Sequence, residues 1–564
     1  MHVFNAQPGQ MGLHLPEALL IDNFAGGGGA SMGIEMATGR PVDIAINHNA
    51  KALGMHYANH PYTDHYCESV WDIDPVEACN GVPVQLAWFS PDCTHFSKAR
   101  GGTPKKKEIR GLAWVAVKWM LEVRPEIVPL ENVEEFRTWG PLGEDSQPIK
   151  ERAGETFNAF IGIITTGIEA DHPGYIECLE FLGLEPGTTK ARQLAKGLGY
   201  KVEFKELRAC DFGAPTTRKR FFMVARCDGL PICWPKPTHG EPESLEVKAG
   251  KLKPFCTAAE CIDWSIPVKS IFDRNKPLAE NTLKRIARGI KKFVIEADEP
   301  FVVPAESVAP FITECANASN QRNLPADQPL RTITAYPKGG TFAVVAPVIE
   351  RQFSQSECNR TDQPLGTITA GGGGKSALVA AFLAKHYGGN YAGAGVDMAA
   401  PLDTITTTDH HALVSSHLVK LRGTCAHGQP VTEPAPTVTA GGTHIGEVRA
   451  FLMKYYSEGG QWASLDDPMH TIPTKDRIGL VIVKGELYRI TDIGMRMLQP
   501  HELYKAQGFP DGYIHTHYID EDGKERKLTK TDQVRMCGNS VSPVVAAAIV
   551  RANLAAEKNK QEAA

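Results

Sequence analysis

The sequence predicts an α/β fold in which a mainly parallel sheet carries helices on both faces and is interrupted by a β-rich repeat region. Short apolar strands alternate with helical stretches over about the first 230 residues, which is the pattern of such a sheet. A repeated Pro and Thr-Ile-Thr unit fills residues 301–484, and helical texture returns over 485–564. The repeat region therefore lies between two parts of the α/β unit.

Apolar runs predict five strands in the first part of the chain. They cover residues 19–24, 43–47, 84–90, 126–133 and 221–225. Residues 109–125 have helical apolar spacing and end at a proline, so we expect a helix there. Ligands of parallel sheets bind beyond the carboxyl ends of the strands. The polar and glycine-rich residues that follow each strand are thus the candidate site.

The bulk composition is that of an ordinary globular protein. The chain has 564 residues, enough for more than one domain, with 42% hydrophobic and 22% charged residues. The N-terminus lacks a basic segment followed by an apolar run, and no apolar stretch reaches the roughly 18 residues of a membrane span. The thirteen cysteines show no zinc-ribbon spacing. We expect a cytoplasmic protein with reduced thiols, no bound metal and no membrane contact.

The region 301–484 contains five versions of one unit. Each has a proline, a short Thr-Ile-Thr strand, a polar or glycine-rich turn and a second apolar run. The anchor threonines are Thr332, Thr367, Thr404, Thr437 and Thr471. Their spacing of 33 to 37 residues is typical of stacked structural repeats. Such an array is either duplicated scaffold or a recognition surface, and its variable turns favour recognition.

Glycines follow the first strand, in the run Asp22-Asn23-Phe24-Ala25-Gly26-Gly27-Gly28-Gly29. Glycine lets a backbone turn tightly and approach a ligand, while the helix that follows presents its N-terminus. Many strand–helix turns carry glycine simply to turn, so this loop alone is compatible with any nucleotide-like cofactor.

Chemically reactive residues follow three further strands. Cys93 comes after Pro91 at the end of the third strand, and Glu131 ends the fourth. A nucleophile and a proton-donating carboxyl on adjacent strand ends suit covalent catalysis with acid assistance. Arg218 and Arg220 are two residues apart, so in an extended segment they point to one face and could hold a carboxylate and a ligand oxygen. A lone cysteine is more often buried packing, and only the company of these residues favours a catalytic one.

A basic cluster comes directly after Cys93 in a chain whose net charge is −5. That net charge does not indicate a nucleic-acid binder, and an isolated charged run is usually a solvated loop. The position beside Cys93 favours contact with phosphates instead. The residues that we expect to make such contacts are Ser97, Lys98, Arg100, Lys105, Lys106 and Lys107.

Taken in order, these motifs resemble the DNA (cytosine-5) methyltransferase family, of phage, prophage or restriction–modification type. The matching segments are Asp22–Gly33, Pro91–Ser97, Glu131–Val133, Thr216–Arg220, Arg489–Thr491 with Gln507–Pro510, and Gly538–Val541. Four positions depart from the family pattern: Asp92, Thr94, Thr216 and the pair Asn47-His48. Six motifs in the family's order are far more specific than any one of them.

The resemblance implies a Rossmann-like S-adenosylmethionine-dependent domain, with catalytic parts at 1–235 and 485–564. Residues 236–300 would form a helical or irregular connector, and 301–484 a target-recognition region inserted before the C-terminal motifs. It implies Cys93, Glu131, Arg218 and Arg220 as catalytic residues. It implies donor contacts from Asp22, Phe24, Ala25, Gly26, Gly28, Gly29, Asn47, His48, Asn539, Ser540 and Val541. The substrate would be double-stranded DNA, flipped at the target cytosine.

Other functions are compatible with the same motifs. A tRNA cytosine-5 methyltransferase has the same chemistry but a compact chain, whereas this one carries about 180 residues of repeats. A catalytically silent DNA-binding or anti-restriction protein would not need Cys93, Glu131 and the two arginines. The sequence leaves open a separate restriction endonuclease as partner, and a phage-encoded enzyme would act in the cytoplasm of its bacterial host.

Overall fold

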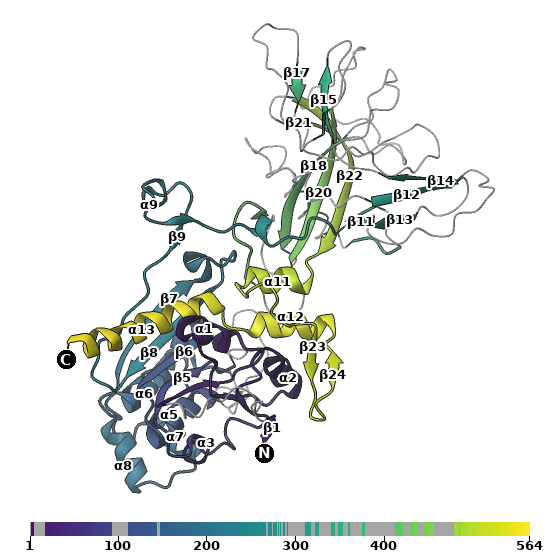
Figure 1. Cartoon of the computed structure of the whole chain (residues 1–564). Coiled ribbons are helices and arrows are strands. Elements are labelled where there is room, and N and C mark those ends of the chain that lie inside the picture. Colours follow the sequence, from purple (N-terminus) through teal and green to yellow (C-terminus); the bar gives the residue numbers. More distant parts are fainter. Residues whose placement is uncertain are drawn as a thin grey trace. The chain divides into compact units, whose positions relative to one another are not determined.

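The structure is a computed structural model, which describes residues 2–4, 17–92, 111–143, 147–266 and 486–563, with shorter stretches between 269 and 483. The chain divides into two compact units (Figure 1). The first comprises Met1–Cys261, Glu433–Thr443 and Gln499–Ala564, and the second comprises Ile262–Thr432 and His444–Leu498. The first unit thus combines segments far apart in sequence. The first unit resumes at Gln499. The sequence pattern places this return at residue 485, one strand earlier.

The first unit is built on an eight-stranded sheet with the order β1-β4-β3-β2-β5-β6-β8-β7. Its strands are β1 (His2–Phe4), β2 (Leu19–Asn23), β3 (Ile44–Ile46), β4 (Asp64–Tyr66), β5 (Val84–Phe89), β6 (Ile127–Asn132), β7 (Lys201–Arg208) and β8 (Lys219–Arg226). The five strands from β4 to β6 are parallel, while β1, β8 and β7 run antiparallel to their neighbours. This confirms the predicted mainly parallel sheet and all five predicted strands.

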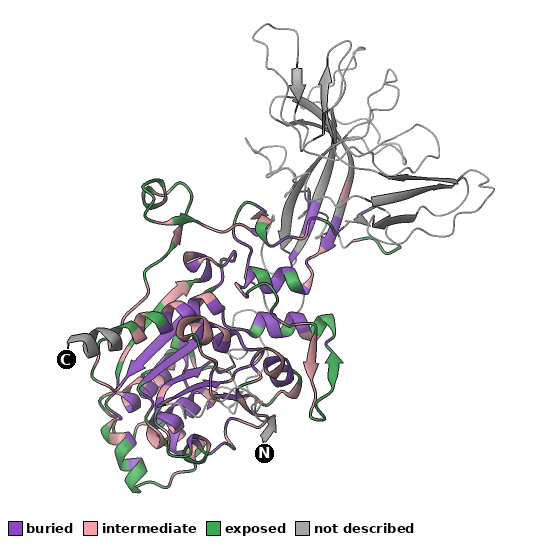
Figure 2. Cartoon of the chain, viewed as in Figure 1, coloured by how far each residue is buried: buried purple, intermediate pink, exposed green. Residues whose placement is uncertain are grey.

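Helices cover both faces of this sheet, because successive side chains of each strand point to opposite faces. On β2, Ile21 packs with one group of helices and Leu20 packs with another. The first group is α5 (Trp114–Glu122), α6 (Glu155–Ile164), α7 (Pro173–Leu182) and α8 (Thr189–Lys196), and the second is α1 (Gly29–Thr38) and α13 (Pro543–Ala563). Figure 2 shows the strands buried between these layers. Helix α5 confirms the helix expected within 109–125.

The C-terminal segment contributes to the same layer as the first helix. It contains α11 (Pro500–Ala506), β23 (His517–Ile519), β24 (Glu525–Lys527), α12 (Lys530–Asn539) and α13. Helices α1 and α13 pack so closely that a Cβ added to Gly33 would lie 2.5 Å from the Cβ of Ala546. The shorter elements of the first unit include α2 (Ala50–Asn59), α3 (Pro75–Cys79), β9 (His239–Gly240), α9 (Leu245–Lys248) and β10 (Lys253–Pro254).

The strands that the structure describes in the second unit all pair antiparallel. Its largest sheet has the order β11-β22-β20-β18-β19, with β21 paired to β22. The strands are β11 (Lys269–Ser270), β12 (Phe311–Ala316), β13 (Arg322–Pro325), β14 (Gly340–Val344), β15 (Val348–Gln352), β16 (Asn359–Arg360), β17 (Lys375–Ala377), β18 (Ala412–Lys420), β19 (Gln429–Pro430), β20 (Ile445–Lys454), β21 (Gly479–Val483) and β22 (Glu486–Met497). Of the five anchor threonines, only Thr437 lies among the described residues. Beside it, Ala435 forms an isolated parallel bridge with Thr216.

No helix in the described ranges is long and apolar enough to cross a membrane. Within the same ranges, no group of three or more histidine, cysteine, aspartate or glutamate residues has the arrangement of a metal site. The nine cysteines whose side chains the structure describes are free thiols.

Candidate active site

Strands β5 and β6 end side by side, with Phe89 in register with Leu130. Strand β5 leads into Pro91 and Asp92, after which Cys93 lies outside the described residues. The side-chain amide of Asn132, the last residue of β6, donates to the carbonyl oxygen of Pro91 at 3.2 Å. The end of β6 therefore fixes the start of the segment that carries Cys93.

The carboxyl group of Glu131 is buried beside two arginines. Its Oε1 lies 3.3 Å from Arg220 Nε and 3.9 Å from Arg218 Nη2, so both guanidinium groups face one carboxyl oxygen. This arrangement confirms that the two arginines share a face. Burial raises the pKa of Glu131, and the opposing effects of Arg220 and Arg218 do not cancel it. A carboxyl group that holds its proton to higher pH is suited to donate it to a base.

Arg218 has further partners in the C-terminal segment. Its Nη1 donates to the carbonyl oxygen of Gly538 at 3.0 Å, and its Nη2 donates to that of Ser540 at 2.9 Å. The Arg218 side chain is 4% exposed, compared with 16% for Arg220. Arg218 thus binds the turn between α12 and α13 to the Glu131 end of the sheet. Of the two arginines, Arg220 is the one more accessible to a substrate.

The loop after β2 has an unusual backbone. Phe24, Gly26 and Gly28 have φ values of 66°, 54° and 90°. Residues other than glycine seldom adopt this region of backbone conformation. A left-handed phenylalanine costs on the order of 1–3 kcal/mol, and such residues cluster at ligand sites. The loop is also tightly packed, because a Cβ on Gly29 would lie 2.0 Å from Ser540 Oγ and 2.3 Å from the Val541 carbonyl oxygen.

Asp22 anchors the helix that follows this loop. Its Oδ2 accepts from the Ser31 backbone N–H at 3.0 Å and from the Ser31 hydroxyl at 2.7 Å. Ser31 is in the first turn of α1, where backbone N–H groups lack partners within the helix and a carboxylate is favourable. Asp22 is fully buried. Asp22 therefore anchors the loop after β2 to the first turn of α1.

The other expected donor residues surround the same loop. The Ala25 N–H donates to the Ile46 carbonyl oxygen at 3.0 Å, which joins the loop to the end of β3. Immediately after β3, the Asn47 side chain accepts from the Asn49 N–H at 2.9 Å, while His48 is exposed. Asn539, the last residue of α12, is exposed, whereas Ser540 and Val541 in the turn that follows are buried. The structure thus gathers the residues expected at the ends of β2 and β3 and in the C-terminal turn.

Seven of the expected site residues cannot be placed in this way. The expected nucleophile and the expected DNA contacts lie outside the described residues: Cys93, Ser97, Lys98, Arg100, Lys105, Lys106 and Lys107.

Comparison with known proteins identifies the first part of the chain. Residues 19–140 match the family model of the C-5 cytosine-specific DNA methylases. The chain is 25% identical over 261 residues to the Type II methyltransferase M.AquIA of Picosynechococcus, covering 44% of this chain and 90% of that protein. It is 26% identical over 268 residues to M.SacI of Streptomyces achromogenes, covering 44% and 57%. Residues 19–140 therefore carry a C-5 cytosine-specific DNA methylase domain, and the relatives support a DNA cytosine-5 methyltransferase.

Solved structures similar to this methyltransferase include a DNA modification methyltransferase encoded within a prophage of E. coli, at 14% identity and a TM-score of 0.38. Another is the Dnmt2 methyltransferase of S. pombe, at 12% identity and a TM-score of 0.37. Each comparison covers 96% of this chain and 99% of the other.

The residues of the loop after β2 fit a donor of the S-adenosylmethionine type. A Cβ on Gly26 would meet nothing nearer than the Phe24 carbonyl oxygen at 3.7 Å, so one side of the loop is open to a ligand. The Phe24 ring is only partly buried and could stack on a base. The opposite side of the loop is closed by Ser540 and Val541.

Some polar residues of this methyltransferase site were not expected from the sequence. His56, His60 and His65 lie with Tyr513 behind the loop after β2. A signal was available for two of them, because His56 of α2 and His60, the residue that caps this helix, are four residues apart and so lie on one face. No signal in the sequence brings Tyr513 to Gly27, which lies 486 residues away along the chain.

Proposed function

We propose that this methyltransferase transfers a methyl group from S-adenosylmethionine to C5 of a cytosine flipped out of duplex DNA, through a covalent adduct with Cys93. The observation that supports this most directly is the environment of Glu131. A buried carboxyl with a raised pKa faces Arg220, and its neighbour Asn132 binds the backbone that leads to Cys93.

The chemistry begins with the weak reactivity of cytosine C5. Attack of the Cys93 thiolate at C6 converts the ring into an electron-rich enamine. Glu131 donates its proton to N3 as the thiolate attacks, which requires the raised pKa that burial gives it. Arg220, supported by Arg218, holds the base oxygen O2 and stabilises the charge that develops on the ring. C5 then takes the methyl group, and loss of the C5 proton releases Cys93.

The donor would be held by the loop after β2 and its neighbours. When bound, S-adenosylmethionine supplies an electrophilic methyl group on a sulfonium. Phe24 would stack on the adenine, and the backbone from Ala25 to Gly29 would contact the amino-acid part. Asn47 and His48 would lie at the ribose, and the turn Asn539–Val541 would close the pocket. Asp22 would act from beneath the loop, since its Oδ2 is bound to Ser31.

DNA would be held by the basic segment after Cys93 and read by the repeat region. Extruding a base costs a few kcal/mol, which phosphate contacts from Lys98, Arg100 and Lys105–Lys107 would offset. Phosphate contacts carry no sequence information, so base-edge readers are needed elsewhere. The Type II relatives suggest a restriction–modification role with a separate endonuclease.

The covalent step is tested with duplex DNA containing 5-fluorocytosine, which blocks release because C5 carries no proton. With S-adenosylmethionine, the wild type should form a stable protein–DNA adduct whose labelled peptide contains Cys93. Cys93→Ser should abolish both the adduct and methyl transfer while retaining DNA binding. The matched control is Cys227→Ser, a partly exposed cysteine that should behave as wild type. An adduct at another cysteine would overturn the assignment.

The substrate is tested with a labelled methyl donor supplied with duplex DNA or with tRNA. Incorporation into DNA at cytosine C5 is expected. Incorporation into tRNA alone would overturn the DNA assignment, and incorporation into neither would support a catalytically silent protein.

The role of the repeats is tested by replacing their turns. Exchanging residues 409–411 or 475–477 for glycine and serine should alter or abolish the methylated motif in bisulfite sequencing, with donor binding intact. An unchanged motif after every turn is replaced would make the repeats a scaffold.

A further inference from the structure

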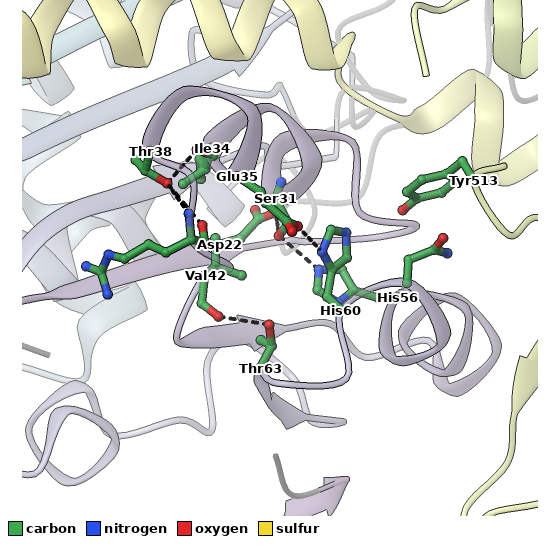
Figure 3. Close-up of polar contacts among 12 residues, drawn as sticks. Asp22, Ser31, Ile34, Glu35, Thr38, Val42, His56, His60, Thr63 and Tyr513 are labelled. Carbon is green, nitrogen blue, oxygen red and sulfur yellow. Dashed lines mark hydrogen bonds and ion pairs between the residues drawn. The ribbon is translucent and has the colours of Figure 1, made fainter. Parts of the chain in front are cut away.

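A buried chain of hydrogen bonds runs beneath the loop after β2. Ser31 Oγ lies 2.7 Å from Asp22 Oδ2, His56 Nε2 lies 2.9 Å from Ser31 Oγ, and His65 Nε2 lies 2.8 Å from His56 Nδ1. All four residues have 0% exposure. Figure 3 shows His56 reaching from α2 toward Ser31, which is bound in turn to Asp22. We call these four residues the relay.

Both imidazoles of the relay are neutral at physiological pH. Burial lowers the pKa of His65 to about 3, with a further lowering by His60. Burial, His60 and His65 together lower the pKa of His56 well below its ordinary value. A neutral imidazole has one N–H donor and one nitrogen acceptor. The direction in which each hydrogen bond of the relay is donated therefore depends on the direction of its neighbour.

The ionised form of Asp22 sets one direction. A carboxylate only accepts, so the Ser31 hydroxyl must donate to Asp22, and His56 Nε2–H must then donate to Ser31 Oγ. His56 Nδ1 is left as an acceptor, so His65 donates from Nε2. The proton of His65 then lies on Nε2, and its Nδ1 carries none.

A proton on Asp22 Oδ2 permits the opposite direction. Asp22 then donates to Ser31 Oγ, Ser31 donates to His56 Nε2, and His56 Nδ1–H donates to His65 Nε2. His65 now carries its proton on Nδ1. Gaining one proton thus reverses every bond, and neither ring becomes charged.

The groups around the relay leave Asp22 as its titrating member. Burial raises the pKa of Asp22 to about 7 although both bonds from Ser31 oppose the shift. Tyr513 faces Asp22 from the C-terminal segment and keeps its proton, because burial raises its pKa. Glu35 of α1 is bound to His60 Nδ1 at 2.9 Å (Figure 3). Asp22 Oδ1 accepts no hydrogen bond from any residue that the structure describes.

We propose that the relay makes the loop after β2 discriminate the cationic methyl donor from its neutral thioether product, by releasing a proton from Asp22 when the donor binds. The proposal rests on the proposed function, because it takes this loop as the donor site. Asp22 and Ser31 would be positioning residues, and His56 and His65 would hold the two proton arrangements.

The physical basis is the charge that distinguishes the two ligands. S-adenosylmethionine carries a sulfonium charge that S-adenosylhomocysteine lacks, while their adenosine and amino-acid parts are the same. A cation near a buried carboxyl stabilises the ionised form and lowers its pKa. Donor binding should therefore ionise Asp22 and set the relay in one direction. After methyl transfer the charge is gone, Asp22 regains its proton and the product is held less tightly.

Calorimetric titration in phosphate and in Tris buffer measures the protons released on binding. Near pH 7 the full chain should release about half a proton with S-adenosylmethionine, and close to none with S-adenosylhomocysteine or at pH 9. Affinity for the donor relative to the product should rise by up to roughly tenfold per pH unit below pH 7 and level off above it. Equal proton release with both ligands, or none with either, would overturn the proposal.

Nitrogen NMR of ¹⁵N-histidine-labelled protein tests the relay itself. The Nδ1 and Nε2 shifts of His56 should exchange between their protonated and unprotonated values from pH 5.5 to 8.5, and on addition of S-adenosylmethionine at pH 6. Assignment uses the peak lost in His56→Gln. Fixed tautomers under both changes would overturn the relay in the wild-type protein, whatever the variants do.

Two variants with a matched control complete the test. Asp22→Asn should stop proton release and bring the affinities for donor and product closer together. Ser31→Ala should uncouple the His56 tautomer from Asp22 and shift the proton release to higher pH, because the bond from the Ser31 hydroxyl lowers the pKa of Asp22. In the control Asp43→Asn, a partly buried carboxyl with a raised pKa is removed at the amino end of β3, and release should persist. If S-adenosylmethionine fails to bind the wild type at all, the proposed function fails; binding without proton release defeats only this inference.

Discussion

The site contains two buried carboxyl groups, at the ends of strands that flank β5, and their surroundings differ in charge. Glu131 at the end of β6 faces two guanidinium groups, whereas Asp22 near the end of β2 is bound by the neutral Ser31. Burial nevertheless raises the pKa of both. Desolvation therefore decides protonation at each position, and the charged neighbours decide how the carboxyl responds to a ligand. The arginines fix the position of the Glu131 carboxyl for a bound base. The pKa of Asp22, in contrast, can respond to a ligand that carries a positive charge.

The largest effect should come from Glu131→Gln, which keeps the shape of the side chain but removes its proton. Methyl transfer should fall by about 10²- to 10⁴-fold, the usual contribution of a general acid. Donor affinity should stay unchanged. In the wild type, turnover should fall as pH rises through the raised pKa of Glu131, because the protonated form is the active one. Labelled-donor assays across pH measure both.

The matched control for this change is Glu134→Gln, three residues further along, where the side chain is 57% exposed. It should retain wild-type turnover. A Glu131→Gln enzyme with more than a tenth of wild-type turnover would show that another group protonates the base.

Substitutions of Arg218 and Arg220 should have different effects on stability and on turnover. Arg218→Met removes two bonds to buried backbone carbonyls, and a hydrogen bond to a charged group contributes about 1.5–3 kcal/mol. It should lower both the free energy of unfolding and the affinity for S-adenosylmethionine, because the turn at Ser540 loses its anchor. Arg220→Met should mainly lower turnover. Chemical denaturation and donor titration distinguish them, and equal losses of stability would contradict the division of roles.

The Asp22 carboxyl should make the folded protein less stable as pH rises, which is the opposite of the usual effect of an aspartate. Its native pKa of about 7 lies above the ordinary 3.8, so between these values the folded protein holds a proton that the unfolded chain lacks. Stability then falls as pH rises through this window, by about 1.4 kcal/mol per pH unit and about 4 kcal/mol at most. Asp22→Asn removes this dependence of stability on pH. Relative to wild type, the variant should gain stability in urea unfolding from pH 5 to pH 8, and a constant difference would refute the raised pKa.

The sequence predicts the frame of this site better than its contacts. Apolar runs such as 84–90 predict strands because a parallel strand buried on both faces needs a nearly continuous apolar sequence. The two-residue spacing of Arg218 and Arg220 fixes their shared face for the same local reason. What each arginine then touches depends on Gly538 and Ser540, which are 320 and 322 residues from Arg218 along the chain. Such partners are set by the tertiary packing of α12 and α13, and no local pattern encodes them.

The smallest effect should come from Tyr513, which closes the back of the loop after β2. Its hydroxyl donates to the Gly27 carbonyl oxygen at 2.5 Å, so Tyr513→Phe should cost about 0.5–1.5 kcal/mol of unfolding free energy. Gly28→Ala should cost more, because its φ of 90° strains any side chain and its Cβ would lie 2.4 Å from the Tyr513 hydroxyl.

Combining these two changes tests whether that contact defines the loop. Removing the hydroxyl removes the collision but not the strain, so the double variant should be less destabilised than the sum of the single variants by about 0.5–3 kcal/mol. Urea unfolding of all four proteins gives this coupling energy. Additive losses would mean that backbone strain alone excludes a side chain at Gly28, and that the contact with Tyr513 does not limit the space behind the loop.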